Sequence, residues 1–146
     1  MNRDIVQQVA AKGVVFDKSG RILILRESGA EAYITNTQSG KWQLPGGRVE
    51  KGEKFQDALI REITEETSLN VEVKSPILVG EWRPNIRGKQ HQIIGIFVSC
   101  FTATTDVVLS AEHDKYTWVS KENYKDYQII QPDNQAIADF FASFKV

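Results

Sequence analysis

Apolar residues occur in short runs, or alternate with polar ones, along most of the chain, which favours a structure rich in β-strands. Residues 13–27 predict two strands joined by a tight turn at 17–20, and therefore a hairpin. Later strands are expected at 70–83, as two short strands broken at Ser75-Pro76, at 91–103 and at 115–120. Glycine and polar residues between these segments predict a loop at 28–41, a turn at 43–47 and a connecting loop at 84–89.

Helical spacing of apolar residues occurs in two places. The first, at 54–67, has four apolar residues at three- and four-residue intervals: Phe55, Ala58, Leu59 and Ile63. The second follows the start signal Pro132-Asp133 and has the same spacing at four positions: Ile137, Phe140, Phe141 and Phe144. Many strands and two helices that do not alternate strictly predict an α+β fold, an αβα sandwich with a mixed sheet, in a single domain over residues 1–146.

The composition narrows the classes of function. A net charge of −1 shows no basic excess, so we expect no nucleic-acid polymer as a partner. No apolar run approaches the roughly 18 residues of a membrane span, so we expect no membrane partner. The single Cys100 excludes an internal disulfide, fits a reducing compartment and lies in an apolar run, where a buried, unreactive thiol is expected. We therefore expect a soluble, cytoplasmic protein.

Three acids crowd onto the end of the first predicted helix. Glu62, Glu65 and Glu66 are neighbours at i, i+3 and i+4, and like charges at this spacing destabilise an isolated helix. They also lie near the C-terminal end of the helix, where the helix dipole disfavours negative charge. One interpretation is a solvated charged face, with Arg61 and Lys54 as counter-ions. The other is a site for a divalent cation, Mg²⁺ or Mn²⁺, because carboxylate oxygens are the ligands that these ions prefer.

The surroundings of these acids resemble the signature of the Nudix hydrolases. In that signature a glycine is followed after five residues by a glutamate, and after seven more by R-E-U-x-E-E-x-G-U, where U is aliphatic. Here Gly47 is followed after five residues by Glu53, and seven more residues lead to REITEETSL at 61–69. The one departure is Ser68 in place of glycine, and the preceding Trp42 and LPGG at 44–47 are also similar to the family. Ser68 falls where a left-handed cap residue ends the helix, a conformation that we expect to destabilise the fold by roughly 1 kcal/mol.

The resemblance implies an αβα sandwich and a metal-dependent hydrolase of nucleoside diphosphates linked to another group. Glu62, Glu65 and Glu66 match the metal-binding positions of the family, with the carbonyl of Gly46 or Gly47 as a possible further ligand. Glu53 matches an acid that assists the metal site or holds the signature arginine, here Arg61. Homodimers are frequent in the family, so a homodimer is a further expectation.

Candidates for the remaining parts of the site come from the helix of the signature and from segments outside it. The catalytic base of the family varies, and the candidates here are Glu65, Glu66, Glu53 and Glu112. His113 follows Glu112 and is interpreted either as part of the site or as a structural histidine. The candidates for binding substrate phosphates are led by Arg26 and Arg48, followed by Arg83, Arg87, Lys41 and Lys89.

Aromatic and amide side chains are candidates for binding a nucleobase. Tyr33, Trp42 and Trp82 offer an aromatic face, although packing is the favoured role for each. Asn134 offers both a donor and an acceptor to a base, and can alternatively cap the last helix.

The favoured substrate is a nucleoside triphosphate, including oxidised or deoxy forms, because the chain is short and has no added domain. The alternatives are an ADP-ribose, nucleotide-sugar or dinucleoside polyphosphate hydrolase, and a module of the same fold that senses a nucleotide without cleaving it. A calcium-binding or acidic interaction domain is disfavoured, because no loop of the EF-hand pattern occurs in the sequence.

Overall fold

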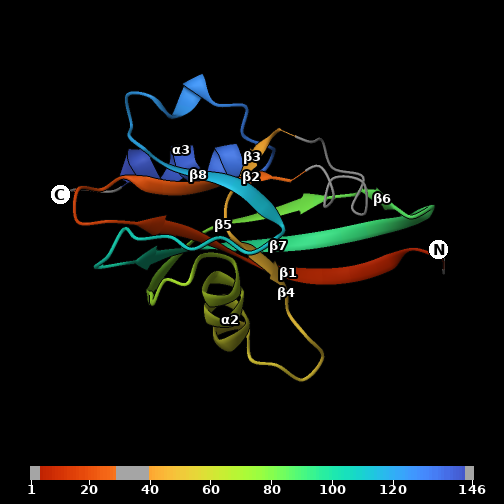
Figure 1. The fold of residues 1–146 in the computed structure, drawn as a ribbon. Coiled ribbons are helices and arrows are strands. Elements are labelled where there is room, and N and C mark those ends of the chain that lie inside the picture. Colours follow the sequence, from red (N-terminus) through yellow and green to blue (C-terminus); the bar gives the residue numbers. More distant parts are fainter. Residues whose placement is uncertain (1–3, 29–39, 144–146) are drawn as a thin grey trace.

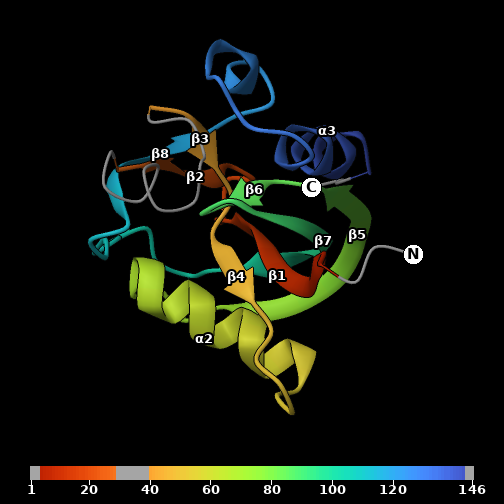
Figure 2. The same ribbon diagram turned by 90° about the vertical axis from the view of Figure 1, so that its right-hand side faces the viewer.

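A computed structural model describes residues 4–28 and 40–143 of the protein. Within these residues, an eight-stranded sheet lies between two α-helices (Figures 1 and 2). Along the chain the elements are β1 (Val6–Phe16), β2 (Ile22–Glu27), β3 (Trp42–Gln43), β4 (Gly46–Arg48), α2 (Phe55–Thr67), β5 (Glu72–Trp82), β6 (Asn85–Ile86), β7 (Lys89–Phe101), β8 (His113–Val119), the 3₁₀ helix η1 (Tyr124–Asp126) and α3 (Asp133–Ser143). Among the described residues, no helix is both long and apolar enough to cross a bilayer.

The sheet is mixed, as the sequence predicts. Its main path runs β3-β2-β1-β7-β5, with β4 paired to β1, β6 to β7 and β8 to β2. Strand β1 runs parallel to β7 along its whole length, whereas the other pairs are antiparallel. The opposite edge of β1 is shared, because Ala10 to Lys12 face β4 and Phe16 faces β2. This divided edge brings β4 and its glycines against the middle of β1.

Two apolar cores lie on opposite faces of the sheet. One core joins α2 to the sheet through residues such as Leu59, Ile63 and Val15, and includes Cys100. Burial raises the pKa of the Cys100 thiol to about 12, which fits the expected unreactive cysteine. The other core joins α3 to the sheet through residues such as Ile137 and Phe97. Figure 2 shows α2 and α3 on opposite sides of the sheet, which confirms the predicted αβα sandwich.

The hairpin at the start of the chain is confirmed, but its first strand is longer than predicted. The Asp17 side chain accepts hydrogen bonds from the backbone N–H groups of Ser19 and Arg21, which fixes the turn between β1 and β2. Strand β1 begins at Val6 rather than Gly13. Its polar beginning is paired to β7, where the Gln7 amide also donates to Gln92, and this partner is distant in the sequence.

The predicted break at Ser75-Pro76 is wrong. Strand β5 continues through it, and its register against β7 shifts on both sides of Pro76. Ser75 has no register partner on β7 at this irregularity, and its N–H donates to the Ser99 hydroxyl instead. Proline is tolerated at such an irregularity because it has no N–H to contribute to the ladder.

Three other boundaries also differ from prediction. Residues 84–89, expected as a loop, contain β6 and turn into β7 through Arg87 and Gly88, whose φ values of 52° and 78° suit a two-residue hairpin turn. The turn expected at 43–47 is flanked by the short strands β3 and β4, and β8 begins at His113 rather than Lys115. The loop expected at 28–41, with Tyr33, lies mostly outside the described residues, as does Phe144.

Helix α2 ends as expected, with Ser68 in the left-handed region (φ 62°, ψ 14°) and its N–H donating to the Thr64 carbonyl. A side chain with a Cβ is strained in this conformation, and the hydroxyl of Ser68 makes only a long contact of 3.4 Å to the Val108 carbonyl. The serine therefore supplies little that offsets the backbone strain.

We expect Ser68→Gly to raise the free energy of unfolding by about 1 kcal/mol, and the melting temperature by about 4 °C, because glycine relieves this strain. Chemical and thermal denaturation measure the change. Ser68→Ala is the control, since it removes the hydroxyl but keeps the Cβ. If the alanine variant were as stable as the glycine variant, the strain would not be the cause.

Candidate active site

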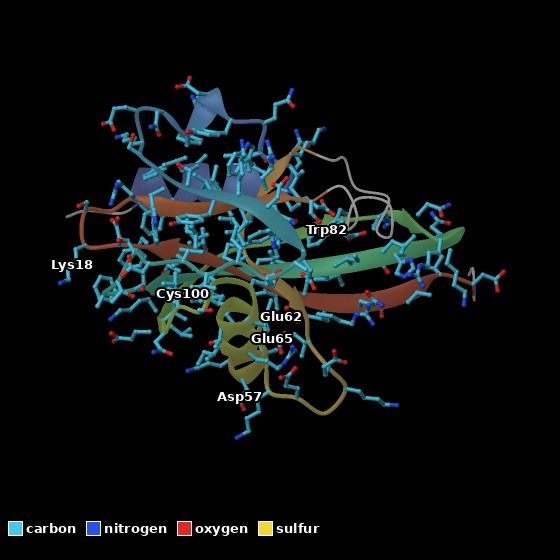
Figure 3. The ribbon with its side chains drawn as sticks, viewed as in Figure 1. Lys18, Asp57, Glu62, Glu65, Trp82 and Cys100 are labelled. Atoms are coloured by element: carbon cyan, nitrogen blue, oxygen red, sulfur yellow. The ribbon has the colours of Figure 1, made fainter. Side chains whose placement is uncertain are left out.

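Glu66 is the acid around which the site is built. It lies on the buried face of α2 with Ile63, and only 5% of its surface is exposed. Glu62 and Glu65 extend from the same part of the helix (Figure 3), with Glu62 half-buried and the side chain of Glu65 59% exposed. The three acids therefore differ sharply in their access to water, which the helical spacing alone did not show.

The carboxyl of Glu66 has few partners for a buried acid. Its Oε1 accepts a hydrogen bond of 2.7 Å from the Gly46 N–H, and its Oε2 lies 3.9 Å from Nδ1 of His113. Burial raises the pKa of Glu66 well above its usual value, with smaller raising effects from Glu112 and Glu62, against lowering by Gly46 and by the charge of Lys12. An ionised Glu66 is therefore unfavourable here unless a further positive charge approaches it.

The two glycines of β4 allow the strand to pass close to both β1 and α2. Gly46 has a φ of 148°, and a Cβ on it would collide with the backbone of Ala11 and Lys12. A Cβ on Gly47 would fall on the carboxylate of Glu62. Only glycine at these positions lets the backbone approach the acids so closely. The role of their carbonyls as metal ligands stays a prediction.

Arg61 joins the exposed side of the acidic group to the loop before α2. Its guanidinium makes two hydrogen bonds to Glu53, of 2.8 and 2.9 Å, and lies 3.0 Å from Glu62 and 3.5 Å from Glu65. It also donates to the backbone carbonyl of Arg48. The guanidinium lowers the pKa of Glu53 to about 2. Of the two roles expected for Glu53, the structure therefore shows the one of holding Arg61.

Glu112 and His113 reach the site from the start of β8. Glu66, Glu112 and His113 each offer a ligand atom within 4.8 Å of the others. Glu112 is exposed, whereas the side chain of His113 is only 2% exposed. Burial, with a smaller effect of Lys12, lowers the pKa of His113 to about 4, so that the ring is neutral near pH 7. We define these three residues as the acid–histidine cluster, a grouping suitable for a divalent cation.

Two further charged residues beside the site were not expected. Lys12 of β1 and Asp133 at the start of α3 form a buried ion pair with an N–O distance of 3.2 Å, and the Leu44 N–H donates to the same carboxylate oxygen. This pair ties β1, the turn before β4 and α3 together. A lysine within the apolar run VAAKGVVF was the available sequence signal, because an uncompensated charge is rarely buried.

The predicted phosphate-binding arginines occupy different environments. Arg26 makes two 2.8 Å hydrogen bonds to Asp114, its neighbour across the β2–β8 pair, so its charge is already partnered. Arg48 is exposed and directly follows Gly47 in β4. Of the two arginines, Arg48 is therefore the one beside the acids whose side chain is exposed to water.

The predicted base-binding residues lie near α3. Trp42 is half-buried and packs edge-on against Tyr127, with 5.3 Å between ring centroids, which agrees with a packing role. The side chain of Asn134 accepts a hydrogen bond from the Gln135 N–H in the first turn of α3. Asn134 also lines two adjoining hollows, of about 420 and 340 Å³, the second of which Trp82 shares.

Comparisons with known proteins agree with this architecture. The model of the NUDIX domain family matches residues 6–140. Nucleoside triphosphatase NudI of Salmonella arizonae is 35% identical over 98 residues, which cover 62% of this chain and 69% of that protein. The crystal structure of a MutT protein from Methanosarcina mazei has a TM-score of 0.78 at 26% identity, covering 99% of this chain and all of that one. An Ap4A hydrolase of C. elegans shares the fold, with a TM-score of 0.67 at 23% identity over 92% of this chain and 96% of its own.

We expect Glu66→Gln to stabilise the metal-free protein by about 1 kcal/mol at pH 8, because the amide removes a buried charge but keeps an acceptor for Gly46. The raised pKa of Glu66 means that the wild type loses stability as the pH rises above the unfolded value near 4. The difference in free energy of unfolding between the variant and wild type should therefore shrink as the pH falls to about 4. Urea denaturation in EDTA at pH 8 and at about pH 4 measures this difference. A variant less stable than wild type at pH 8 would show that the carboxylate is compensated within the protein.

Proposed function

The chain belongs to the Nudix hydrolase family, and we propose that it is a pyrophosphohydrolase of nucleoside triphosphates that depends on Mg²⁺ or Mn²⁺. The observation that carries the proposal is the buried Glu66 carboxyl in the signature helix, faced by Glu112 and His113. The substrate class is supported by the similarity to proteins named nucleoside triphosphatase NudI.

The residues present fit a hard divalent cation. Glu66 and Glu112 would hold it, with Glu62 and Glu65 of the same helix turn and a carbonyl of Gly46 or Gly47 as further oxygen ligands. A bound cation neutralises the charge of phosphate oxygens and lowers the pKa of a coordinated water. It would also supply the positive charge that the buried Glu66 lacks.

Some of these acids also have a second task. Glu112 is exposed at the rim of the cluster, so its carboxylate oxygen that does not hold the cation is the one best placed to accept a proton from an attacking water. Glu65 is the exposed alternative on α2. Glu53 is committed to Arg61 and positions the helix rather than taking a proton, in keeping with its lowered pKa. Arg61 in turn orients Glu62.

Binding of the substrate requires cationic and polar groups around this centre. Exposed Arg48 is the proposed phosphate contact, whereas Arg26 would first have to leave Asp114. Asn134, beside the hollows near α3, is the proposed contact to the base. Trp42 supports that region by packing against Tyr127. Formation of a homodimer stays a prediction.

We expect hydrolysis of nucleoside triphosphates in Mg²⁺ or Mn²⁺ and none in EDTA. The assay follows phosphate release, with coupled pyrophosphatase, from nucleoside triphosphates, 8-oxo-dGTP, ADP-ribose, nucleotide sugars and dinucleoside polyphosphates. Turnover of another group on this panel would correct the substrate class and retain the metal-dependent hydrolase. A folded protein that binds nucleotide and metal but cleaves none would favour a sensor.

We expect Glu66→Gln to lower kcat on the order of 100-fold or more, because it removes a charged ligand from the centre without changing its shape. The matched control is Glu72→Gln on β5, where the glutamate is exposed and, within the described part of the chain, forms an ion pair only with Lys74. Steady-state kinetics at saturating metal separates the two variants. Equal activity of Glu66→Gln and wild type would refute the placement of the metal centre.

A further inference from the structure

We propose that His113 is itself a ligand of the divalent cation, through Nδ1, and that the site therefore binds Co²⁺ and Zn²⁺ more tightly than an all-oxygen site would. The inference rests on the proposed function, since it requires a cation at the acid–histidine cluster. It assigns to His113 a role that goes beyond the acids of the signature helix.

The position of Nδ1 is the first argument. The atom is buried and has no hydrogen-bond partner within residues 4–28 and 40–143. It faces Oε2 of Glu66 at 3.9 Å, too far for a hydrogen bond between them. Two ligands at about 2.1 Å from one metal ion can be separated by at most about 4.2 Å, so one ion can contact both atoms. A buried polar atom without a partner, aimed at a carboxylate, is the arrangement that a cation would satisfy.

The other ring nitrogen is held in place. Nε2 of His113 lies 2.9 Å from the side-chain amide nitrogen of Gln43, in β3. An amide rotated by 180° presents its carbonyl oxygen instead, and can then accept the Nε2 proton. In that arrangement Nδ1 carries a free lone pair, and metal-binding histidines are commonly fixed in this way by a partner on the second nitrogen. In the opposite arrangement Nδ1 carries the proton, which then points towards Glu66 without reaching it as a hydrogen bond.

The charges around the cluster agree with a nitrogen ligand. Glu66 and Glu112 together balance the charge of one divalent cation, and a neutral imidazole adds a ligand without adding charge. Lys12, whose charge acts on both Glu66 and His113, is held in its ion pair with Asp133. Imidazole nitrogen suits Co²⁺ and Zn²⁺ better than Mg²⁺, so its presence changes the preference of the site and not only its affinity.

The second histidine of the chain shows what a structural histidine looks like here. His91 is also buried, but its Nδ1 lies 2.9 Å from the carbonyl oxygen of Lys89, and it is outside the acid–histidine cluster. The sequence contains two histidines, so the ring signals of His91 and His113 can be told apart with one substitution each.

The direct test is NMR of untagged protein labelled with ¹⁵N-histidine, titrated with Zn²⁺. We expect the Nδ1 resonance of His113 to shift on binding, while both ring nitrogens of His91 stay unchanged. A His113 ring that keeps its proton on Nδ1, or does not shift while Zn²⁺ binds elsewhere in the protein, overturns the proposal. This measurement is made on the wild type and does not depend on the folding of a variant.

Calorimetric titration of His113→Gln gives the second test, with His91→Gln as the matched control. We expect the affinity of the His113 variant for Co²⁺ and Zn²⁺ to fall about 10- to 100-fold and that for Mg²⁺ to change less than about threefold. If the affinity for all three metals falls equally, or does not fall, His113 is not a ligand of the cation, and the proposed function is unaffected. If Glu66→Gln binds each metal as tightly as wild type, the metal centre of the proposed function fails as well.

Discussion

The constraint on which the site depends is the burial of one carboxyl group, that of Glu66, at the end of α2. Removing an ionised acid from water is unfavourable unless hydrogen bonds or opposite charges replace the lost hydration. Within the described residues, Glu66 has one backbone donor, Gly46, and the charge of Lys12 nearby. These two partners lower the pKa of the acid but do not offset its burial. The fold thus retains an acid that is best satisfied by a ligand from outside the protein.

The rest of the structure holds the groups around this carboxyl in place. The core under α2 fixes the helix against β1, and the glycines of β4 let that strand approach the acids. Arg61 and Glu53 brace the loop before the helix, while the Lys12–Asp133 pair ties β1 to α3. Exposed Glu65 and Glu112 lie towards water. A rigidly held, buried carboxyl with exposed acids beside it is an arrangement suited to binding a cation near the surface.

The parts that sequence predicted well depend on local spacing. Helix α2, the turn at Asp17 and the strained end at Ser68 are determined by residues within a few positions of each other. The acids of the signature helix were identified in the same way. Their unequal burial was not, because it depends on how α2 packs against β1 and β4.

The parts that sequence missed depend on partners far along the chain. Pro76 does not break β5, because the Ser99 hydroxyl accepts the hydrogen bond of the Ser75 N–H at the irregularity. The charge of Arg26 is already partnered, because its guanidinium donates to Asp114 of β8. Lys12 is tolerated in a buried strand because Asp133 lies beside it. His113 was left open between two roles, and only the pairing of β8 with β2 brings it to Glu66. Each of these contacts joins residues 20 or more positions apart, which spacing cannot reveal.

In the proposed function, a divalent cation resolves the unfavourable burial of Glu66. The most direct measurement is thermal unfolding of wild type and Glu66→Gln across a Mn²⁺ titration, since a ligand that binds only the folded state raises the melting temperature with its concentration. We predict that the wild type gains stability steadily with Mn²⁺ while the variant gains little or none. Equal gains in both proteins, or no gain in the wild type, would contradict the account.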